Sequence, residues 1–536
     1  MITEITHRRL ENSLGEFDAP HILVMGLGES GVAMARWSIT QGARVSMHDT
    51  RSVEQLSQVA RDSLAVMEKI GIEQITFGPA LENVSLDQVD VIAMSPGLSP
   101  KEESVKTLLE RAKQKNISLW GELDFFSKAL VSLKALQGYD PKVIAITGTN
   151  GKTTTTALTG VICAKAGKSV AIAGNISPSL LDKLNTCLVS QDLPEIWVLE
   201  LSSYQLFYCD HFAPHAATIL NISEDHLDWH GDMLHYTQAK AKIFGQDTIA
   251  VVNRDDAAVM GLFPIEETSR RRVISFGMDT PLVQDSFGIV GDMTGGGIDW
   301  LAWASPTEEY LSSLHTKKRK SKISAEYDAD PIQIKRLIPV EALLIRGRHN
   351  ATNTLAAIAL AQAIGLGMSA LLHGLRDYRG EPHRVQSIAI IDGVEYIDDS
   401  KGTNVGATIA ALNGLGAQAN QLSQKKILLI AGGDGKQQNF APLKEPIEQF
   451  VCQLVLIGKD AHFIELIMHG SQVPIYRADS LEDAVTYCAA IAKSGDCVLL
   501  SPACASFDMF KDYVHRAQVF TDAVEELTMQ LPGVHV

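Results

Sequence analysis

A glycine-rich turn that contains a lysine and three threonines follows an apolar run at residues 143–146 and carries the clearest chemical signal in the chain. Glycines let backbone N–H groups turn toward phosphate oxygens, the lysine adds positive charge, and a threonine hydroxyl can reach a nucleotide-bound Mg²⁺. The strict phosphate-loop pattern has glycine where this chain has Ile146, but the strand, turn and helix signals agree. We therefore predict that ATP phosphates bind to Gly148, Thr149, Asn150, Gly151, Lys152, Thr153 and Thr154.

Two side chains that can bind a metal follow the next predicted strands. Glu200 ends the apolar run at 196–200, and His226 follows the run at 217–220. Taken singly, Glu200 could pair with a lysine and His226 could be an ordinary loop histidine. Both nevertheless stand at strand ends next to a phosphate loop, where Mg²⁺ needs ligands held close to the nucleotide. We predict that they bind metal.

A second glycine-rich turn, at residues 26–31, joins an apolar strand at 21–25 to a helical pattern. Asp49 ends the next predicted strand, and Ser95-Pro-Gly97 follows a further one at 89–94. This order is typical of a Rossmann site, in which a phosphate approaches a helix N-terminus and a polar residue lies near a ribose or base. We predict that a nucleotide-like ligand binds there.

Basic side chains beside glycines or short hydroxyl residues form a third group toward the end of the chain. Arg384, Lys401 and Lys436 follow or flank predicted strands, and a helix predicted over 352–363 carries Asn353 in its first turn. Any one of these cations could belong to a solvated face, but together they suit carboxylates and phosphates. We therefore predict an anionic substrate.

Three modules of alternating strand and helix signals must position these residues. The chain has 536 residues, and at about 150 residues per domain this length allows three or four domains. We predict an α/β fold with an N-terminal Rossmann-like domain (1–139), a central P-loop ATPase-like domain with a mainly parallel sheet (140–344) and a C-terminal Rossmann-like domain (345–536). Within the central domain, the polar range near 280–340 is expected to be a surface insertion that carries the basic run 317–322.

Composition excludes several classes of protein. The formal net charge of −16 speaks against a general nucleic-acid or anionic-membrane surface. The N-terminal residues lack the apolar core of a signal peptide, and no apolar run approaches the ~20 residues of a membrane span, so we expect a cytoplasmic protein. The seven cysteines are scattered, which argues against disulfides or a zinc site. We expect a monomer.

The order of the motifs resembles that of the Mur ligases of bacterial peptidoglycan synthesis, and the resemblance covers nearly the whole chain. Besides the residues named above, the motifs that carry the resemblance are Arg348-His-Asn350, Pro382-His-Arg384, Asp399-Ser-Lys401, Gly432-Gly-Asp-Gly-Lys436 and Ser501-Pro-Ala-Cys-Ala-Ser506. Within the family, the branch that adds D-glutamate is indicated by Leu201-Ser-Ser-Tyr-Gln-Leu206, by Asn150 in place of a histidine, and by the segment 501–508.

The resemblance implies an ATP-dependent ligase. ATP would phosphorylate the alanine carboxylate of UDP-N-acetylmuramoyl-L-alanine, and the amine of D-glutamate would then attack the acyl phosphate, with two Mg²⁺ ions assisting. By match to the family's motifs, catalysis would use Lys152, Glu200, His226 and Lys240, and metal would bind Thr153, Glu200, His226 and Lys240. ATP would also meet Asn353, Arg384 and Asp399. The UDP group would face Glu29, Ser30, Asp49, Thr50, Arg51, Ser95 and Gly97, with Asn175 nearer the reacting end. D-Glutamate would contact Lys401, Thr403, Lys436, Ser506, Phe507 and Tyr513.

Lys240 reads from the sequence alone as a surface lysine on a helix, whereas the resemblance implies a carbamylated lysine at this position. Carbamylation requires an unprotonated amine and hence a lowered pKa, which burial would supply.

Two departures from the family pattern bear on binding. Glu29 would repel a phosphate unless its backbone N–H does the binding, and Tyr513 stands where an aromatic ring without a hydroxyl also occurs.

Three other functions remain open from the sequence. The first module by itself would fit a nicotinamide oxidoreductase, which leaves the phosphate loop and the third module unexplained. An ATP-gated binding protein would leave Arg384, Asp399 and Lys401 without a chemical task. Within the family, the nearest alternative adds L-alanine to UDP-N-acetylmuramate, but that branch usually has histidine before the Gly-Lys-Thr of the loop.

Overall fold

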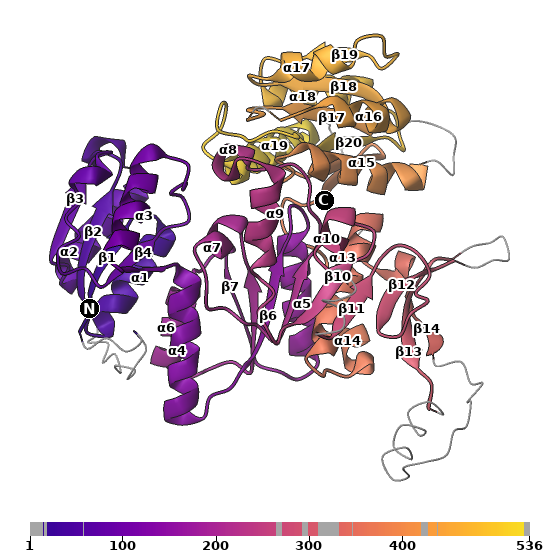
Figure 1. The fold of residues 1–536 in the computed structure, drawn as a ribbon. Coiled ribbons are helices and arrows are strands. Elements are labelled where there is room, and N and C mark those ends of the chain that lie inside the picture. The colour runs from indigo at the N-terminus through magenta and orange to yellow at the C-terminus, as the bar shows by residue number, and fades with distance from the viewer. Residues whose placement is uncertain are drawn as a thin grey trace. The chain divides into compact units, whose positions relative to one another are not determined.

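Three separate sheets of mostly parallel strands form the framework of the chain (Figure 1). The structure is a computed structural model, and it describes residue 14 and residues 19–56, 58–263, 271–291, 298–308, 332–345, 347–419, 427–436 and 438–529. Helices connect most of the parallel strands, as a parallel sheet requires. The architecture agrees with the predicted α/β class.

The first sheet has five parallel strands in the order β3-β2-β1-β4-β5. The strands are β1 (His21–Met25), β2 (Arg44–Asp49), β3 (Gln74–Phe77), β4 (Val91–Met94) and β5 (Ser118–Trp120). The helices are α1 (Glu29–Thr40), η1 (Val53–Gln55), α2 (Gln58–Ile70), η2 (Leu81–Asn83), α3 (Glu103–Gln114) and α4 (Glu122–Gln137). Met25 pairs in register with both His48 and Met94, so the turns that follow β1, β2 and β4 meet at one edge. The predicted nucleotide-like ligand would bind at this edge.

The central sheet has nine strands in the order β14-β13-β12-β11-β10-β9-β6-β8-β7. Its strands are β6 (Lys142–Thr147), β7 (Val170–Gly174), β8 (Ile196–Glu200), β9 (Ala216–Ile219), β10 (Ile249–Asn253), β11 (Val273–Phe276), β12 (Ser286–Val290), β13 (Trp300–Pro306) and β14 (Ile332–Pro339). Its helices are α5 (Lys152–Lys165), α6 (Leu180–Ser190), α7 (Ser203–Phe207), α8 (Leu227–His230), α9 (Met233–Ala241) and α10 (Ala257–Met260). The apolar strands β6, β8 and β9 are neighbouring interior strands of this sheet and are almost wholly buried.

The range 280–340 is partly sheet. Strand β12 continues the parallel order beside β11, β13 pairs antiparallel with β12, and β14 adds the edge. Residues 309–331, which include the basic run 317–322, lie outside the described residues.

The third sheet has six strands in the order β15-β16-β20-β17-β18-β19, and only β15 runs antiparallel to its neighbour. The strands are β15 (Gln386–Ile391), β16 (Val394–Asp398), β17 (Ile427–Gly432), β18 (Val451–Ile457), β19 (Ile475–Arg477) and β20 (Cys497–Leu500). The helices η3 (Val340–Ala342), α13 (Arg348–Ala363) and α14 (Met368–Leu375) precede it in the chain, and α14 packs against α5 of the central domain. The helices of the third domain are α15 (Val405–Ala419), η5 (Ala441–Leu443), α16 (Lys444–Phe450), α17 (Ala461–Ile467), α18 (Leu481–Ile491) and α19 (Tyr513–Met529).

Helix α13 begins four residues earlier than its apolar pattern predicted. It starts at Arg348, directly after Gly347, so Asn353 lies in its second turn rather than its first. The polar sequence Arg348-His-Asn350 carries no apolar period, which is why pattern reading placed the start at Thr352.

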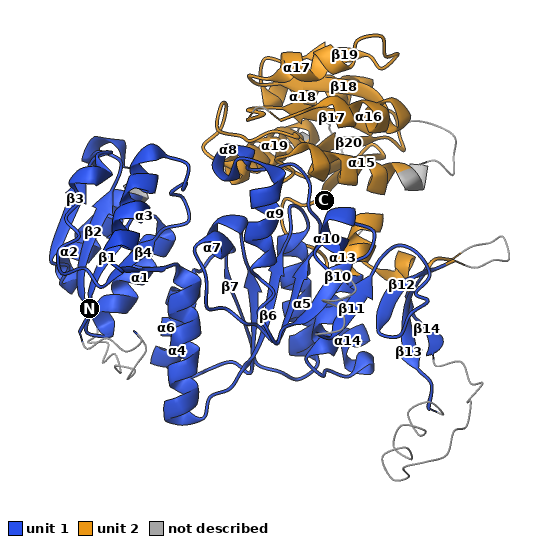
Figure 2. Cartoon of the chain, in the orientation of Figure 1, with its two compact units in different colours: residues 1–290, 300–338, 355–375 blue, residues 291–299, 339–354, 376–536 orange. Residues whose placement is uncertain are grey.

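The chain divides into two compact units (Figure 2). One comprises residues 1–290, 300–338 and 355–375 with the first two sheets, and the other comprises 291–299, 339–354 and 376–536 with the third. All seven cysteines are described and free, and five of them are buried. Among the described helices, none is long and apolar enough to cross a membrane.

Two glycines of the turn at residues 26–31 provide a test of the packing in the first domain. A Cβ at Gly31 would lie 1.9 Å from the carbonyl oxygen of Gly26, whereas a Cβ at Gly28 would meet nothing within 4 Å. We expect Gly31→Ala to destabilise the protein by at least about 1–3 kcal/mol, because backbone atoms must move apart. Gly28→Ala, the matched control, should stay within about 0.5 kcal/mol of the original protein. Urea unfolding followed by circular dichroism measures both, and equal effects would contradict this account.

Candidate functional site

The glycine-rich turn predicted to bind phosphate, called the phosphate turn below, joins β6 to α5. Gly148 and Gly151 have φ values of 155° and 83°, which a residue with a Cβ rarely adopts. The loop after β9 fixes the turn from the side, because Asn221 accepts from the N–H of Asn150 at 2.8 Å and donates to its carbonyl at 3.1 Å. The turn therefore presents the N-terminus of α5, where backbone N–H groups and the helix dipole favour an anion.

Two lysines converge on one carbonyl of this turn. The Nζ atom of Lys152 donates to the carbonyl oxygens of Gly148 at 3.0 Å and Thr149 at 2.9 Å. The Nζ atom of Lys240, on α9, donates to the same Gly148 oxygen at 2.9 Å and to the Thr147 hydroxyl at 3.4 Å. Helix α9 thus brings Lys240, distant in sequence, to the phosphate turn.

Lys240 is only 1% exposed, and its Nζ atom lies 4.6 Å from the centre of the Tyr236 ring. Burial holds the pKa of Lys240 well below its usual value, the charge of Lys152 lowers it further, and Asp225 opposes the shift. The surface position that the sequence alone suggested is wrong. This environment therefore raises the unprotonated fraction of the Lys240 amine above that of an exposed lysine.

Glu200 lies beside the turn because β8 pairs with β6 and β7. The register sets Glu200 opposite Ile146 on one side and Gly174 on the other. Its Oε1 atom accepts from the Asn175 side chain at 2.9 Å, while its buried Oε2 atom has no hydrogen-bond partner. A buried carboxylate oxygen without a donor is costly by itself and suits a cation.

His226 and Thr153 are the other predicted metal ligands. His226 has a left-handed φ of 56°, and its Nε2 atom lies 3.5 Å from Asp225, while its ring lies 4.9 Å from that of Tyr204. Thr153 lies in the first turn of α5 and is buried. In the part of the chain that the structure describes, no group of three or more His, Cys, Asp and Glu side chains is arranged to hold a metal.

Asp49 orders the glycine-rich turn of the first domain from within. Its Oδ2 atom accepts from the N–H of Leu27 at 2.7 Å, and its Oδ1 atom accepts from the N–H and Nε of Arg51 at 2.9 and 2.8 Å. Burial works to raise the pKa of Asp49, but these hydrogen bonds outweigh it and leave the pKa lowered. With Asp49 satisfied internally, the half-exposed Arg51 guanidinium and Thr50 remain at the strand end.

The other predicted UDP residues lie at the same edge. Ser30 donates its hydroxyl to Glu122 at 2.8 Å, and Glu29 accepts from the Ser177 hydroxyl at 3.1 Å. These side chains contact the protein, so a phosphate at this turn would meet the backbone N–H groups that begin α1. The Ser95 hydroxyl lies 3.4 Å from the carbonyl oxygen of Gly26, and Gly97 follows two residues later.

In the third domain, most of the predicted ATP and amino-acid residues lie on turns after β16, β17 and β20, whereas Arg384 precedes β15. His383 pairs through Nδ1 with Asp398 at 2.7 Å, and Lys401 donates its N–H to the carbonyl of His383 at 3.1 Å. This places Arg384 and Asp399 on joined turns. The Nζ atom of Lys401 lies 5.4 Å from the Tyr513 ring, and Thr403 donates its N–H to the carbonyl of Lys401 at 2.9 Å.

The remaining residues of this group follow neighbouring turns. The Nζ atom of Lys436, which has a φ of 47°, lies 6.0 Å from the exposed Phe507 ring, and Ser506 is buried beside it in sequence. Asn353 lies on α13, where it donates to the Asn350 side chain at 3.2 Å.

Matches to known proteins identify the family to which this arrangement belongs. Residues 20–121 match the Mur ligase MurD-like N-terminal domain, residues 146–361 the Mur ligase middle domain, and residues 383–504 the Mur ligase glutamate ligase domain. The chain belongs to the Mur ligase family. Mur ligases are ATP-dependent ligases of peptidoglycan precursor synthesis, so the predicted family, three-domain α/β fold and enzyme class are confirmed.

Individual Mur ligases match over nearly their full length. Proteins from Cupriavidus metallidurans and Ralstonia nicotianae, each named UDP-N-acetylmuramoylalanine--D-glutamate ligase, are 50% identical to this chain over 518 and 513 residues, which is 96% of this chain and 98% of each relative. Among solved structures, MurF from Acinetobacter baumannii has a TM-score of 0.56 at 16% identity, with 94% of this chain and 93% of that chain covered. MurC from Thermotoga maritima has 0.52 at 18%, with 95% and 99% covered. The two structures share the fold.

Three residues of this Mur ligase had no predicted role and now have structural ones. Asn221 holds the phosphate turn, Glu122 joins two loops, and Arg516 is fully buried on α19. Arg516 donates to the Ser400 hydroxyl and carbonyl at 3.0 and 2.7 Å and to the Cys504 carbonyl at 3.1 Å. It therefore ties the turns of Lys401 and Ser506 together. The sequence signal that could have found Arg516 is its charge at a position of α19 whose helical repeat is otherwise apolar.

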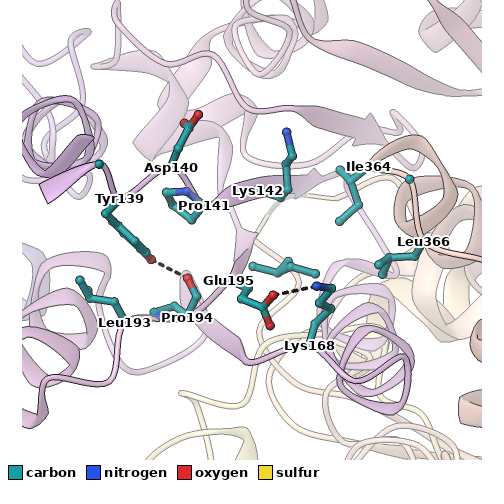
Figure 3. Close-up of a pocket in the computed structure, with 13 residues that line it drawn as sticks. Tyr139, Asp140, Pro141, Lys142, Lys168, Leu193, Pro194, Glu195, Ile364 and Leu366 are labelled. Atoms are coloured by element: carbon teal, nitrogen blue, oxygen red, sulfur yellow. Dashed lines mark hydrogen bonds and ion pairs between the residues drawn. The ribbon is translucent and has the colours of Figure 1, made fainter. Parts of the chain in front are cut away.

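A pocket of about 500 Å³ lies at the opposite edge of the central sheet (Figure 3). Lys142 begins β6 and Glu195 precedes β8, whereas the phosphate turn and Glu200 end these strands. A strand of this length separates the two edges by ~16 Å. The Tyr139 hydroxyl donates to the Pro194 carbonyl at 2.6 Å, and Lys168 pairs with Glu195 at 2.7 Å. No predicted site residue lines this pocket.

Asp399 gives a pH-dependent test of the third domain. It is buried, accepts from the Ser501 hydroxyl at 2.7 Å, and burial raises its pKa to about 7, although that hydrogen bond and Arg384 act in the opposite direction. Because the unfolded carboxyl ionises near pH 4, the folded state binds more protons between about pH 4 and 7, and stability falls as the pH rises through this window. Asp399→Asn should lose this dependence, which has a slope on the order of 1 kcal/mol per pH unit.

Urea unfolding between pH 4.5 and 7.5 measures this dependence. The control is Asp522→Asn, which removes an exposed carboxylate on α19 and should leave the slope unchanged. Parallel pH profiles for the original protein and Asp399→Asn would contradict the assignment.

Proposed function

We propose that this Mur ligase joins D-glutamate to UDP-N-acetylmuramoyl-L-alanine, using ATP and releasing ADP and phosphate. The observation that carries the proposal is the 50% identity over 96% of the chain with relatives named for this reaction. The branch that adds L-alanine has support here only at the level of the fold, at 18% identity. An ATP-gated binding protein would leave the unpartnered Glu200 oxygen and the buried amine of Lys240 without a chemical task.

The first chemical step is phosphoryl transfer to the alanine carboxylate. A carboxylate oxygen attacks the γ-phosphorus of ATP, the bond to the β,γ-bridging oxygen breaks, and ADP leaves. Residues Gly148, Thr149, Asn150, Gly151 and Thr154 would hold the phosphates through the turn and the start of α5. Lys152 can exchange its two carbonyl contacts for phosphate oxygens. The chain's contribution is positioning and charge neutralisation.

The second step forms the amide. The neutral amine of D-glutamate attacks the acyl carbon, a tetrahedral intermediate forms, and its collapse expels inorganic phosphate while the nitrogen loses a proton. Lys401, Thr403, Lys436, Ser506, Phe507 and Tyr513 would hold D-glutamate. The two ammonium groups suit its two carboxylates, because charge-assisted hydrogen bonds are stronger than neutral ones.

Magnesium fits the residues at the phosphate turn. The Oε2 atom of Glu200 is buried and lacks a donor, and Thr153 carries a hydroxyl in the first turn of α5. Mg²⁺ at nucleotide sites takes only one or two protein ligands and completes its shell with phosphates and water. We propose two ions held by Thr153, Glu200, His226 and Lys240. When bound, they would neutralise charge on the transferring phosphoryl group.

Lys240 can become an anionic ligand by carbamylation. Its amine would attack the carbon of CO₂, form an N–C bond and lose one proton, giving a carbamate. Burial of the side chain and its neutral oxygen partners, the Thr147 hydroxyl and the Gly148 carbonyl, support this chemistry. The charge of Asp225 acts in the opposite direction. The carbamate would supply oxygen ligands to the metal, in agreement with the preference of Mg²⁺.

The other predictions are kept as part of the proposal. Glu29, Ser30, Asp49, Thr50, Arg51, Ser95 and Gly97 would form the UDP site, Asn175 would lie near the reacting carboxylate, and Asn353, Arg384 and Asp399 would contact ATP. We also propose domains at 1–139, 140–344 and 345–536 and a monomer in the cytoplasm.

The direct test is phosphate release from ATP by the purified protein with Mg²⁺ and UDP-N-acetylmuramoyl-L-alanine. We expect turnover with D-glutamate and a rate at least about 100-fold lower with L-glutamate or L-alanine. L-Glutamate has the opposite hand and L-alanine lacks the second carboxylate, so each leaves charged groups unpaired. Turnover with UDP-N-acetylmuramate and L-alanine instead would move the protein to the other branch. No turnover with any amino acid would favour a binding protein.

Lys240→Ala tests the carbamate. We expect a loss of about 100-fold or more in kcat, because a metal ligand disappears, and partial recovery when acetate or formate supplies a carboxylate in the cavity. Lys242→Ala is the matched control, because Lys242 ends the same helix but is exposed and pairs with Asp210. A loss that small carboxylates do not relieve, together with intact-protein mass spectra lacking the added CO₂ in the original protein, would contradict the proposal.

A further inference from the structure

Glu122 is a buried carboxylate that the reaction does not use directly. It is the first residue of α4 and is 3% exposed. Its Oε2 atom accepts from the Ser30 hydroxyl at 2.8 Å, and its Oε1 atom accepts from the N–H of Leu181 at 3.1 Å. The Ser179 hydroxyl also hydrogen-bonds to it. One carboxylate thus contacts both the glycine-rich turn of the first domain and the N-terminus of α6.

The segment before α6 connects this carboxylate to the site of chemistry. The N–H of Asn175 donates to the Glu200 carbonyl at 2.7 Å, and its side chain donates to Glu200 Oε1 at 2.9 Å. Gly174 allows this close approach, because a Cβ there would lie 2.2 Å from the Glu200 carbonyl oxygen. Residues 174–181 are therefore fixed at one end by Glu200 and at the other by Glu122.

We propose that Glu122 is a positioning residue that holds the glycine-rich turn in register with the Asn175–Glu200 site. A substrate whose nucleotide end binds at the glycine-rich turn would then present its carboxylate at the Asn175–Glu200 site. This inference rests on the proposed function for the identity of that substrate. A carboxylate at the N-terminus of α6 is also favoured by the helix dipole, which anchors the link at that end.

The link requires a side chain with two polar atoms at this position. Ser30 and Leu181 both offer donors, and a carboxyl group can accept from two donors through two oxygens. Burial raises the pKa of Glu122 to about 7, although the bonds from Leu181, Ser30 and Ser179 lower it. A glutamine can keep both bonds, because its oxygen accepts from Leu181 and its amide donates to the Ser30 hydroxyl, which can also accept.

Four variants separate positioning from general stability. Glu122→Ala removes the link, and Glu122→Gln keeps it. Ser30→Ala removes the hydroxyl that contacts Glu122 and leaves the backbone N–H groups that would meet the phosphate. Arg36→Ala is the matched control. Arg36 on α1 pairs with Asp182 on α6, so this substitution removes a half-exposed contact between the two helices whose N-termini Glu122 joins. Thermal unfolding of each variant checks that it folds, and Ser30→Ala carries the test if Glu122→Ala does not.

We expect Glu122→Ala to lower kcat about 10- to 100-fold, because small misplacements of reacting groups have effects of this size. The directly measured Kd for UDP-N-acetylmuramoyl-L-alanine should change less than about 3-fold, since the groups that bind the UDP end remain. Glu122→Gln and Arg36→Ala should stay within about 3-fold of the original kcat. Ser30→Ala should add little in the Glu122→Ala background, because the two residues act as one link.

A second readout does not depend on turnover. In the original protein, UDP-N-acetylmuramoyl-L-alanine should slow amide hydrogen exchange both at the glycine-rich turn and in residues 174–182, and in Glu122→Ala the protection should stop at the turn. Turnover by the original protein decides the proposed function, and exchange decides the link. Equal protection in both proteins, an unchanged kcat in Glu122→Ala, or a Glu122→Gln variant as impaired as Glu122→Ala would overturn the inference.

Discussion

The pairing of β6 with β8 on one side and β9 on the other is the constraint on which the rest of the site depends. It places Glu200 opposite Ile146 and Ile219 opposite Thr147, so the turn that follows β6 lies between Glu200 and Asn221. The Gly148 carbonyl then accepts from both Lys152 and Lys240. Burial lowers the pKa of Lys240 well below its usual value, and the charge of Lys152 on the same carbonyl lowers it further.

Internal carboxylates explain how an acidic chain can build sites for anions. Asp49 accepts from the backbone at Leu27, Glu122 at Leu181, and Asp398 at Ser400. Each carboxylate is directed into the protein, where it orders a turn whose remaining N–H groups, hydroxyls and lysines can face a ligand. The net charge of −16 therefore gives little information about the local potential at these turns.

In the third domain, a buried cation orders turns as the buried carboxylates do elsewhere. Arg516 is fully buried, and its three hydrogen bonds go to the hydroxyl and carbonyl of Ser400 and to the carbonyl of Cys504. Burial lowers the pKa of Arg516 to about 10, with several aspartates acting against the shift. Ser400 in turn donates to the Tyr513 carbonyl at 2.8 Å. One guanidinium thus orders the turns that carry Lys401, Ser506 and Tyr513.

The sequence by itself determined the features that local backbone chemistry controls. Gly148 and Gly151 occupy conformations that glycine adopts readily, and the apolar runs of β6, β8 and β9 are buried strands as predicted. Only the tertiary structure decided that Lys240 is buried against Gly148 and that Glu122 joins Ser30 to Leu181. The contacts of Lys240 with Gly148 and of Glu122 with Ser30 each join residues 92 positions apart, and that of Glu122 with Leu181 joins residues 59 positions apart. No local sequence pattern shows whether a polar side chain on a helix meets a buried partner or solvent.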